Sequence, residues 1–559
     1  MHFALGLLAP DRPNCGDSRS RSRTRPALTL RLSTEPERES WADAANPFLY
    51  FLAVASGLAN SVAWLVPETT ASALLGWLGA CLLVCTVRAR RVYLPAYCCG
   101  VIGHAVAFYW VYRTVSVFGG FGVLASALIF AMFVLWGALL LLVFAVIHHN
   151  LGPVVDGLAL RSPIAVVVAE LISIRLFPWH FGHSQIAFTP FVQLAGIGGA
   201  MLVSFVLFWS AEVLVRMIVF RERRRAFLLP VLVFAASLGY GGLMMRTFAS
   251  PPGLKQKVLI VQGNSELTAN RDLESAQQNL TRLQELTRQA AGENDLIVWP
   301  EGAIPAYIPA DIGSVRDEPM LPWLANGSAF LVGGYSYRGG EERYNTAFAV
   351  YRDGSVPLPY FKQILIPFGE YMPCSDLFPW LGGMNQRAGT FTAGTKVRVF
   401  GYPMRRRDGQ EYTLKLSPLI CYEDTVPRLA RKATRQGAEL LVNLTYDTWF
   451  GRSAAPFQHH LIAAFRAIEN RRYLIRATNT GYSAVVDPLG RTIARIPPFT
   501  EGTVAVDVSL LNYPSAYTRY VGERPWWGLF FATLGLIVVR RWRDRGSNEL
   551  LVANTLSHF

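Results

Sequence analysis

Hydrophobic positions along this chain fall into long runs at two places, with a stretch of mixed composition between them. The runs fill residues 48–247 and reappear at 526–540. They approach the ~20 mostly apolar residues that a bilayer-spanning helix needs. Seven runs precede the mixed stretch, at 48–66, 69–87, 94–113, 121–147, 162–177, 190–220 and 227–247. The pattern predicts a polytopic α-helical membrane bundle of about eight spans.

The fifth run is the weakest of the eight, because its sequence SPIAVVVAELISIRLF contains Glu170 and Arg175. Ionisable residues are costly inside a span and are therefore candidates for function. The loop that follows carries His180 and His183 beside Trp179. Because Trp favours the membrane interface, we expect this loop to lie at the lipid headgroup level rather than to form a ligand set.

Composition narrows the class of protein further. Apolar residues make up 52% of the 559 residues and charged residues only 16%, whereas soluble domains carry about 25% charged residues. This composition excludes a disordered chain and argues against an ordinary soluble enzyme. Eight apolar runs joined by short loops also leave too little polar surface to cover them in water.

The basic residues predict how the bundle is oriented. Loops after the even-numbered spans and both ends of the chain are rich in Arg, whereas the loops after odd-numbered spans contain one Arg between them. Because basic loops remain in the cytoplasm, we expect both termini there and the mixed stretch outside. The net charge of +14 is then explained by the orientation of the bundle in the membrane. We therefore expect no nucleic-acid partner.

These boundaries divide the chain into five parts. The predicted parts are a disordered basic cytoplasmic extension (1–46), seven transmembrane helices (47–248), an extracytoplasmic domain (249–525), a C-terminal transmembrane helix (526–540) and a cytoplasmic tail (541–559). In the external domain, apolar strands such as VLIVQGN and KLSPLICYED alternate with helical stretches, and a hairpin around Pro488–Gly490 indicates a mixed sheet. We therefore expect an α/β domain. It contains neither GxGxxG after its first strand nor GxxxxGK[ST], and we expect no cofactor.

Three residues at predicted strand ends are candidates for chemistry: Glu301 in IVWPEG, Lys362 in YFKQ and Cys421 in LICYED. Taken singly, such a cysteine is more often a packed small hydrophobe, and such a glutamate or lysine is usually solvated. Together they form a set, because a thiol needs a base to become a thiolate and a cation to stabilise it. The ammonium group can also stabilise an oxyanion.

The cysteines and histidines point to few other sites. Only Cys374 and Cys421 of the seven cysteines belong to the external domain, so there is no disulfide framework. A bond between these two cysteines remains open as the less favoured alternative. His459 and His460 are adjacent and cannot share one helix face, so we expect no metal site.

The sequences around the three candidates resemble a known family. WPEG, a lysine followed by PFGEY, and ICYE are similar to the Glu–Lys–Cys motifs of the nitrilase, or carbon–nitrogen hydrolase, superfamily. With the spans, the chain resembles the membrane-bound apolipoprotein N-acyltransferases over about residues 48–540. The resemblance extends to FPWHFGHSQ, to TWFG (448–451) and to the run 458–490, where we expect the Arg466–Arg476 series to pair with Glu469. The family usually has a short polar residue where Tyr446 precedes Asp447.

The resemblance implies a nitrilase-like α-β-β-α sandwich in the periplasm, attached to a bacterial inner membrane. It implies that Glu301 is the general base and acid, that Lys362 stabilises the thiolate and oxyanion, and that Cys421 is the nucleophile. Residues implied to assist them are Glu370, which would orient Lys362, the neighbours Glu423 and Tyr422, and Trp449 at the substrate entrance.

The resemblance also implies the reaction and its partners. An acyl chain would pass from a phospholipid, by resemblance phosphatidylethanolamine, to the cysteine as a thioester. It would then pass to the N-terminal amine of an S-diacylglyceryl-cysteine apolipoprotein, completing a ping-pong cycle. Because both substrates are anchored in the bilayer by acyl chains, fusion of the domain to membrane helices has a physical reason.

Two other functions remain open on the sequence alone. A membrane-anchored amidase would use the same three residues with water as the acceptor. A non-catalytic transporter or assembly platform would retain only the fold. The presence of all three residues argues against the platform, and the membrane bundle favours the transferase over the amidase.

Overall fold

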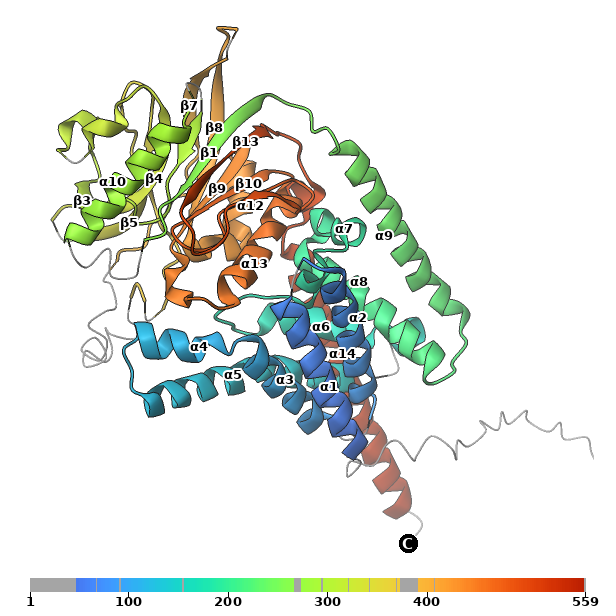
Figure 1. Ribbon diagram of the computed structural model, residues 1–559. Coiled ribbons are helices and arrows are strands. Elements are labelled where there is room, and N and C mark those ends of the chain that lie inside the picture. The colour runs from blue at the N-terminus through green and yellow to red at the C-terminus, as the bar shows by residue number, and fades with distance from the viewer. Residues whose placement is uncertain are drawn as a thin grey trace, which may run out of the picture.

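The computed structural model describes residues 47–556 except 67, 90–91, 153–154, 266–272, 293–294, 320, 341, 368, 372–390 and 407, with side chains up to Arg543. The predicted extension 1–46 and Cys374 lie outside the described residues. The described chain forms two parts, a helical bundle and a sandwich of two sheets, which lie against each other (Figure 1).

The helical part follows the predicted apolar runs. Its helices are α1 Pro47–Leu65, α2 Thr70–Val87, α3 Tyr93–Ala107, α4 Trp110–Arg113, α5 Val123–Leu151, α6 Arg161–Ile172, α7 Thr189–Val192, α8 Ala195–Ile218, α9 Leu228–Thr247 and α14 Arg524–Leu556. Within the described residues, five of these helices are long and apolar enough to cross a membrane. A sixth span results if α3 and the segment 110–117, bent by 54°, count as one. Apolar helices of spanning length are thus confirmed in this part of the chain, and the number eight stays a prediction, since α6 and α14 are outside this set.

The predicted run 190–220 is not one straight helix. It consists of α7 and α8, and α8 is interrupted where Gly199 has φ +74°. Glycine adopts this left-handed conformation without a steric penalty because it has no Cβ. The interruption directs the amide of Ala200 toward the external domain, where it donates a hydrogen bond of 3.3 Å to Glu469.

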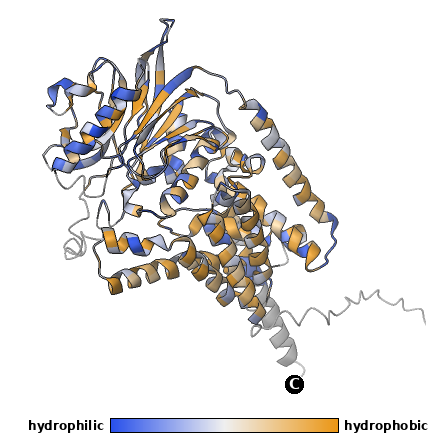
Figure 2. Ribbon diagram, in the orientation of Figure 1, coloured by the Kyte–Doolittle hydropathy of each residue, from blue (hydrophilic) through white to orange (hydrophobic). Residues whose placement is uncertain are grey.

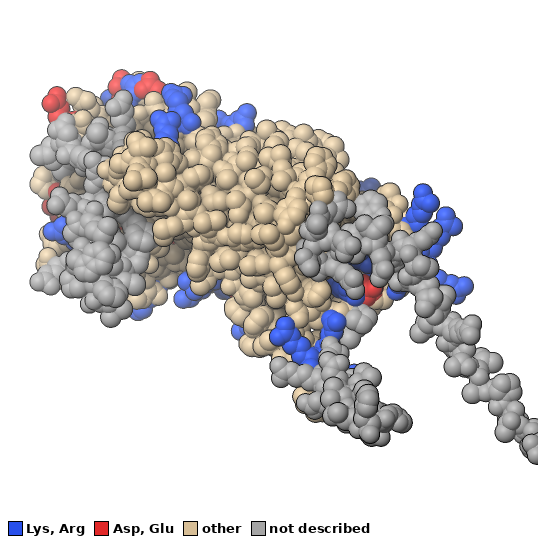
Figure 3. Space-filling view, turned by 90° about the horizontal axis from the view of Figure 1, so that it is seen from below, with Lys and Arg blue, Asp and Glu red and all other residues tan. Residues whose placement is uncertain are grey.

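Loops predicted to share the cytoplasmic side lie together at one end of the bundle. Arg88 after α2 pairs with Glu212 near the end of α8. Arg540 of α14 donates a hydrogen bond of 3.0 Å to the carbonyl oxygen of Asn150 near the end of α5. Seen from the side of the helices, the middle of the described surface has few charged side chains (Figure 3).

The loop after α6 is more deeply buried than the sequence indicates, and its depth relative to the lipid headgroups stays a prediction. His180 and His183 are both buried. The Nδ1 atom of His180 lies 2.9 Å from Glu170 Oε2, and Ser204 donates a 3.0 Å hydrogen bond to Glu170 Oε1. The ring of His183 packs on Phe465 of the external domain with centroids 4.4 Å apart. The loop is therefore part of the interface between bundle and sandwich.

The first sheet of the sandwich is mixed, as the sequence predicts. Its strands are β1 Lys255–Gln262, β2 Leu296–Val298, β3 Tyr307–Pro309, β4 Ala329–Arg338, β5 Glu342–Val350, β6 Tyr360–Phe361 and β13 Gly502–Ser509. They are ordered β13-β1-β2-β4-β5-β6, with β3 beside β4. β1, β2 and β4 are parallel, and β13 and β5 are antiparallel to their neighbours.

The second sheet contains the strand that leads to Cys421. Its strands are β7 Phe400–Arg405, β8 Glu411–Ile420, β9 Leu440–Thr445, β10 Tyr473–Thr478, β11 Ala484–Val486 and β12 Thr492–Arg495, ordered β12-β11-β10-β9-β8-β7. β8, β9 and β10 are parallel. The predicted hairpin around Pro488–Gly490 joins the antiparallel strands β11 and β12.

Two faces of each sheet are buried, which explains why the strands are nearly continuous apolar runs. In β1, Val258 and Ile260 pack between the sheets, whereas Leu259 and Val261 pack under helix α10, Leu273–Ala290. On the outer face of the second sheet lie α12 Pro427–Arg435 and α13 Ala455–Asn470, whose buried residues join one core with the membrane helices. The predicted α-β-β-α layering is present. Figure 2 shows hydrophobic residues along the strands and many hydrophilic residues on the outer helix α10.

Candidate active site

Three loops bring the predicted chemical residues together at one edge of the sandwich. Glu301 follows β2, Lys362 follows β6, and Cys421 follows β8. The three residues are 7%, 1% and 5% exposed, respectively. Residues far apart in the sequence therefore share one buried site, because the two sheets stack with these strand ends at the same edge.

Lys362 lies between two carboxylates. Its Nζ atom is 2.7 Å from Glu370 Oε1 and 3.5 Å from Glu301 Oε1. The second oxygen of Glu301, Oε2, is buried and receives no hydrogen bond of ordinary geometry from the described residues. The arrangement pairs the ammonium group mainly with Glu370 and leaves one oxygen of Glu301 available to accept a proton.

Asn345 is a member of this cluster that the sequence analysis missed. It lies on β5, and its Nδ2 donates hydrogen bonds of 2.6 Å to Glu301 Oε1 and 2.9 Å to Glu370 Oε1. An amide thus holds the two carboxylates at a fixed separation without adding charge. The available signal was an amide residue inside a strand, YNTAFAV, that is otherwise apolar apart from Thr346.

A close backbone approach fixes the position of Glu301. Gly333 on β4 packs under the loop after β2, where a Cβ atom would come within 2.5 Å of the Cα of Glu301. Any side chain at this position would displace the backbone at Pro300 and Glu301. This requirement accounts for glycine in the middle of a buried strand.

The backbone of Cys421 is in the left-handed region, with φ +51°. The residue opens the short helix η9, Cys421–Thr425, directly after β8. A non-glycine residue in this conformation costs roughly 1–3 kcal/mol, and such strain persists where surrounding contacts enforce it. One such contact is the hydrogen bond of 3.0 Å from Asn443 Nδ2 to the carbonyl oxygen of Cys421.

Glu423 joins the loop of Lys362 to the turn of Cys421. One carboxylate oxygen accepts hydrogen bonds from the amides of Gln363 and Ile364, at 2.6 Å and 3.2 Å. The other accepts from the Tyr360 hydroxyl and the amide of Ile420, both at 2.8 Å. Burial raises the pKa of Glu423 to about 7, although these donors act to lower it.

The electrostatics of the site favour a neutral thiol beside a protonated lysine. Burial raises the pKa of Cys421 well above its usual value, the Glu301 carboxylate raises it further, and Lys362 lowers it. Burial also raises the pKa of Glu301, although Lys362 lowers it. Burial lowers the pKa of Lys362, but Glu370 and Glu301 outweigh burial and raise it. A carboxylate with raised proton affinity is suited to accept the thiol proton.

A second buried network lies behind the nucleophile. His459 on α13 contacts Asp424 of η9 through Nε2 at 2.8 Å and Asp447 through Nδ1 at 3.1 Å. Arg476 pairs with Asp424, and its Nη2 lies 3.7 Å from Asp447. The expected pairing of Arg466 with Glu469 is confirmed at 3.0 Å. For Arg476 that expectation is wrong, because the guanidinium binds the turn that carries Cys421.

The other two predicted residues lie where the sandwich meets the bundle. The Tyr422 ring packs on Phe177 of the loop after α6, with centroids 6.2 Å apart. Trp449 lies in η10, Asp447–Phe450, and is 37% exposed. Its carbonyl oxygen accepts a hydrogen bond of 3.5 Å from Thr114, which directly follows α4 in the bent helical segment. No cluster of three or more His, Cys, Asp or Glu side chains able to hold a metal occurs in the described part of the chain.

Comparisons with known proteins agree with this division of the chain. The family model for carbon–nitrogen hydrolases matches residues 257–513. The family model for the apolipoprotein N-acyltransferase N-terminal domain matches residues 56–213. The fold and the site thus define a carbon–nitrogen hydrolase domain joined to membrane helices.

Individual relatives place the chain more narrowly. An apolipoprotein N-acyltransferase from Azotobacter vinelandii is 31% identical over 481 residues, 82% of this chain and 88% of the relative. One from Geobacter metallireducens is 29% identical over 502 residues, 85% and 92% of the two chains. The chain belongs to the apolipoprotein N-acyltransferase family. A solved amidase from Nesterenkonia sp. is 21% identical, with a TM-score of 0.34, over 49% of this chain and 96% of that one.

Proposed function

We propose that this chain transfers an acyl chain from a phospholipid to the N-terminal amine of S-diacylglyceryl-cysteine apolipoproteins. The observation that supports this most directly is the buried cluster of Glu301, Lys362 and Cys421 in a domain whose core is continuous with membrane helices. Family membership supports the acyl acceptor and the lipid origin of the acyl group. The finer assignment of the donor as phosphatidylethanolamine rests on the resemblance of the sequence to the family.

In the first half-reaction, Glu301 takes the proton from the Cys421 thiol, and the thiolate sulfur attacks the ester carbonyl carbon. Lys362, 3.5 Å from Glu301, stabilises the charge that develops on the carbonyl oxygen. The ester C–O bond breaks, and Glu301 returns the proton to the departing lysophospholipid oxygen. An acyl thioester on Cys421 remains.

In the second half-reaction, the α-amine of the diacylglyceryl cysteine attacks the thioester carbonyl carbon. Glu301 removes a proton from the amine, the C–N bond forms and the C–S bond breaks. The released Cys421 sulfur recovers a proton from Glu301, and the triacylated lipoprotein leaves. A single carboxylate can serve both halves because each half begins and ends with the same protonation state.

The neighbouring residues have supporting roles in this scheme. Glu370 orients Lys362, and Glu423 holds the two loops that carry Lys362 and Cys421. Tyr422, by its packing on a loop of the bundle, helps to align the site with the membrane. Trp449 contributes to the entrance through which both lipid-anchored substrates arrive.

We also propose a topology that suits this scheme. We assign residues 249–525 to a periplasmic catalytic domain and 47–248 and 526–540 to the bacterial inner membrane, with 1–46 and 541–559 in the cytoplasm. The gathering of basic loops at one end of the bundle supports this orientation.

The test is mass spectrometry of the purified full chain incubated with phosphatidylethanolamine, before and after addition of a diacylglyceryl-cysteine peptide. We expect an acyl mass on the Cys421 peptide that moves to the amine of the added peptide. The variant Cys421→Ala should form no adduct, whereas Cys98→Ala, which changes a free cysteine of the bundle, should behave as the wild type. An adduct that decays equally fast without the acceptor would instead identify a hydrolase.

A further inference from the structure

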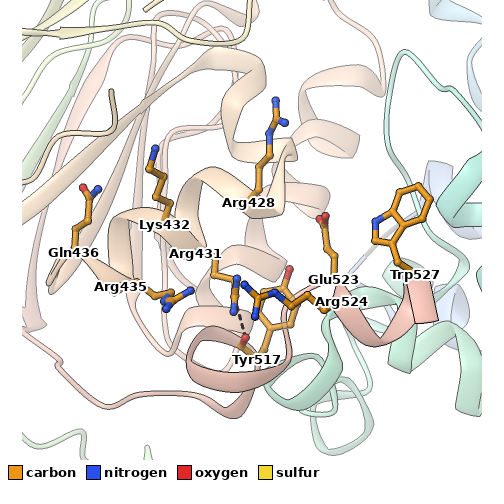
Figure 4. Close-up of a pocket in the computed structure, with 9 residues that line it drawn as sticks. All are labelled: Arg428, Arg431, Lys432, Arg435, Gln436, Tyr517, Glu523, Arg524 and Trp527. Atoms are coloured by element: carbon orange, nitrogen blue, oxygen red, sulfur yellow. Dashed lines mark hydrogen bonds between the residues drawn. The ribbon is translucent and has the colours of Figure 1, made fainter. Parts of the chain in front are cut away.

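A basic pocket lies between α12, on the outside of the sandwich, and the first turn of α14. It has a volume of about 600 Å³, within the ~300–1,000 Å³ of many ligand sites. Five cationic side chains line it, four from α12 and one from α14 (Figure 4): Arg428, Arg431, Lys432, Arg435 and Arg524. None of them belongs to the candidate active site.

The charge of this pocket is unbalanced. Among the described residues that line it, Glu523 is the one acidic side chain. The structure gives Arg428, Lys432 and Arg435 no salt bridge to any described residue, and all three are exposed. Like charges gathered in this way repel one another, so an anionic ligand would relieve the repulsion.

Two details indicate that the fold holds these cationic side chains in position on one surface. In the helix PRLARKATR, Leu429, Ala430 and Ala433 are buried against the sandwich. This packing directs Arg428, Lys432 and Arg435, at positions i, i+4 and i+7, along the opposite side. Arg431 is held in place by a hydrogen bond of 3.1 Å from its Nε to the carbonyl oxygen of Tyr517.

An apolar stripe continues from the pocket along α14. Trp527 lines the pocket and is 44% exposed. Phe531, Leu534 and Val538 follow it at i+4, i+7 and i+11 and are 62%, 48% and 57% exposed. These spacings put the four side chains on one face of the helix. A Trp at the start of a membrane helix marks the depth of the lipid headgroups.

We propose that the pocket binds the phosphate of an anionic phospholipid headgroup, with the acyl chains lying along the stripe Trp527–Phe531–Leu534–Val538. Arginine guanidinium groups bind phosphate oxygens bidentately, and five cations match a headgroup with net negative charge better than a zwitterionic one. In the proposed orientation, the pocket faces the outer leaflet. Retention of loops in the cytoplasm explains basic residues elsewhere in this chain, but it does not explain the charge of this pocket.

The test uses the full chain in nanodiscs of phosphatidylcholine containing a minor fraction of phosphatidylglycerol, with native mass spectrometry to count retained lipids. The variant Arg428→Gln/Lys432→Gln/Arg435→Gln should lower phosphatidylglycerol retention about tenfold or more. The matched control Arg316→Gln/Arg338→Gln/Lys415→Gln removes the same number of exposed charges elsewhere on the sandwich and should retain the lipid as the wild type does.

A second variant keeps the proposal testable if the triple variant fails to fold. Glu523→Gln removes the acidic side chain of the pocket and should increase phosphatidylglycerol retention over phosphatidylcholine. Equal loss in both triple variants, or no change in Glu523→Gln, would overturn the proposal. Binding of inorganic phosphate that depends on the three cations, without selective retention of phosphatidylglycerol, would also overturn it, because the source would then be a free anion.

Discussion

The Lys362 ammonium group is nearer to Glu370, at 2.7 Å, than to Glu301, at 3.5 Å. The two carboxylates therefore have different tasks around one cation. Glu370 compensates and orients the lysine, and it also accepts a hydrogen bond of 2.9 Å from the amide of Ile366 in the same loop. Glu301 is left less tightly paired, as a group that must gain and lose a proton has to be.

This division predicts the effect of Glu370→Gln. The amide keeps a hydrogen-bond acceptor for Lys362 but removes the charge that raises the pKa of both Lys362 and Glu301. Glu301 becomes a weaker base, and the lysine is held less firmly. We expect formation of the acyl thioester to slow about ten- to hundredfold, measured as the rate at which the acyl mass appears on Cys421. Glu342→Gln, which changes an exposed carboxylate, should leave the rate unchanged, and an equal loss there would contradict the division.

Asn345 predicts a shift in the pH profile. The variant Asn345→Asp replaces the donor shared by Glu301 and Glu370 with a third negative charge. The added repulsion raises the pKa of Glu301, so the base is deprotonated only at higher pH. The alkaline shift of the acylation rate should be about one pH unit or more. Asn326→Asp adds the same charge at an exposed turn and should not move the profile. If the pH profile of the acylation rate in Asn345→Asp matches that of the wild type, Asn345 has no influence on Glu301.

Glu423 predicts a combined loss of stability and rate. Its carboxylate accepts four hydrogen bonds, whereas a glutamine would turn an NH₂ group toward two of the donors. Glu423→Gln should lower the free energy of unfolding by about 2–3 kcal/mol, seen as a lower thermal midpoint of the purified chain. Thioester formation should fall as well, because the loops of Lys362 and Cys421 lose their shared anchor. If stability falls while the rate per folded molecule is unchanged, Glu423 only supports the fold.

The main residues of the site could be predicted from the sequence, because each lies in a compact motif next to a strand. Glu301, Lys362 and Cys421 follow apolar runs whose ends predict where the chain leaves a sheet. Their convergence comes from the stacking of two sheets, for which the resemblance to a family supplied the expectation. Asn345 was missed because one polar residue in a strand reveals neither its face nor its partners.

The membrane part was predicted in outline for a similar reason. Hydropathy predicts where helices lie along the chain. It does not predict the interruption at Gly199 or the bend after α3, because these depend on contacts with other elements. The burial of His180 and His183 was also missed, because a loop beside a span is buried only when another domain covers it. Here α13 of the sandwich provides that cover, through residues such as Phe465.

His459 predicts an alkaline loss of stability. Burial lowers its pKa, but Asp424 and Asp447 outweigh burial and raise it from 6.5 to about 9. The folded chain therefore holds this proton more tightly than the unfolded chain. Its contribution is fully present below pH 6.5 and is lost as the pH rises toward 9, amounting to at most ~3 kcal/mol. The expected observation is a thermal midpoint that declines from about pH 6 to about pH 10.

Substitution at two neighbouring positions isolates this contribution. In His459→Gln the alkaline decline of the thermal midpoint should flatten, because glutamine between Asp424 and Asp447 has no proton that titrates in this range. Burial lowers the pKa of His460, so its titration ends before the alkaline range, and His460→Gln should keep the decline. Since Asp424 lies three residues after Cys421, the loss of charge at His459 should also slow thioester formation over the same pH range. An alkaline decline of equal slope in His459→Gln and His460→Gln would show that another group controls it.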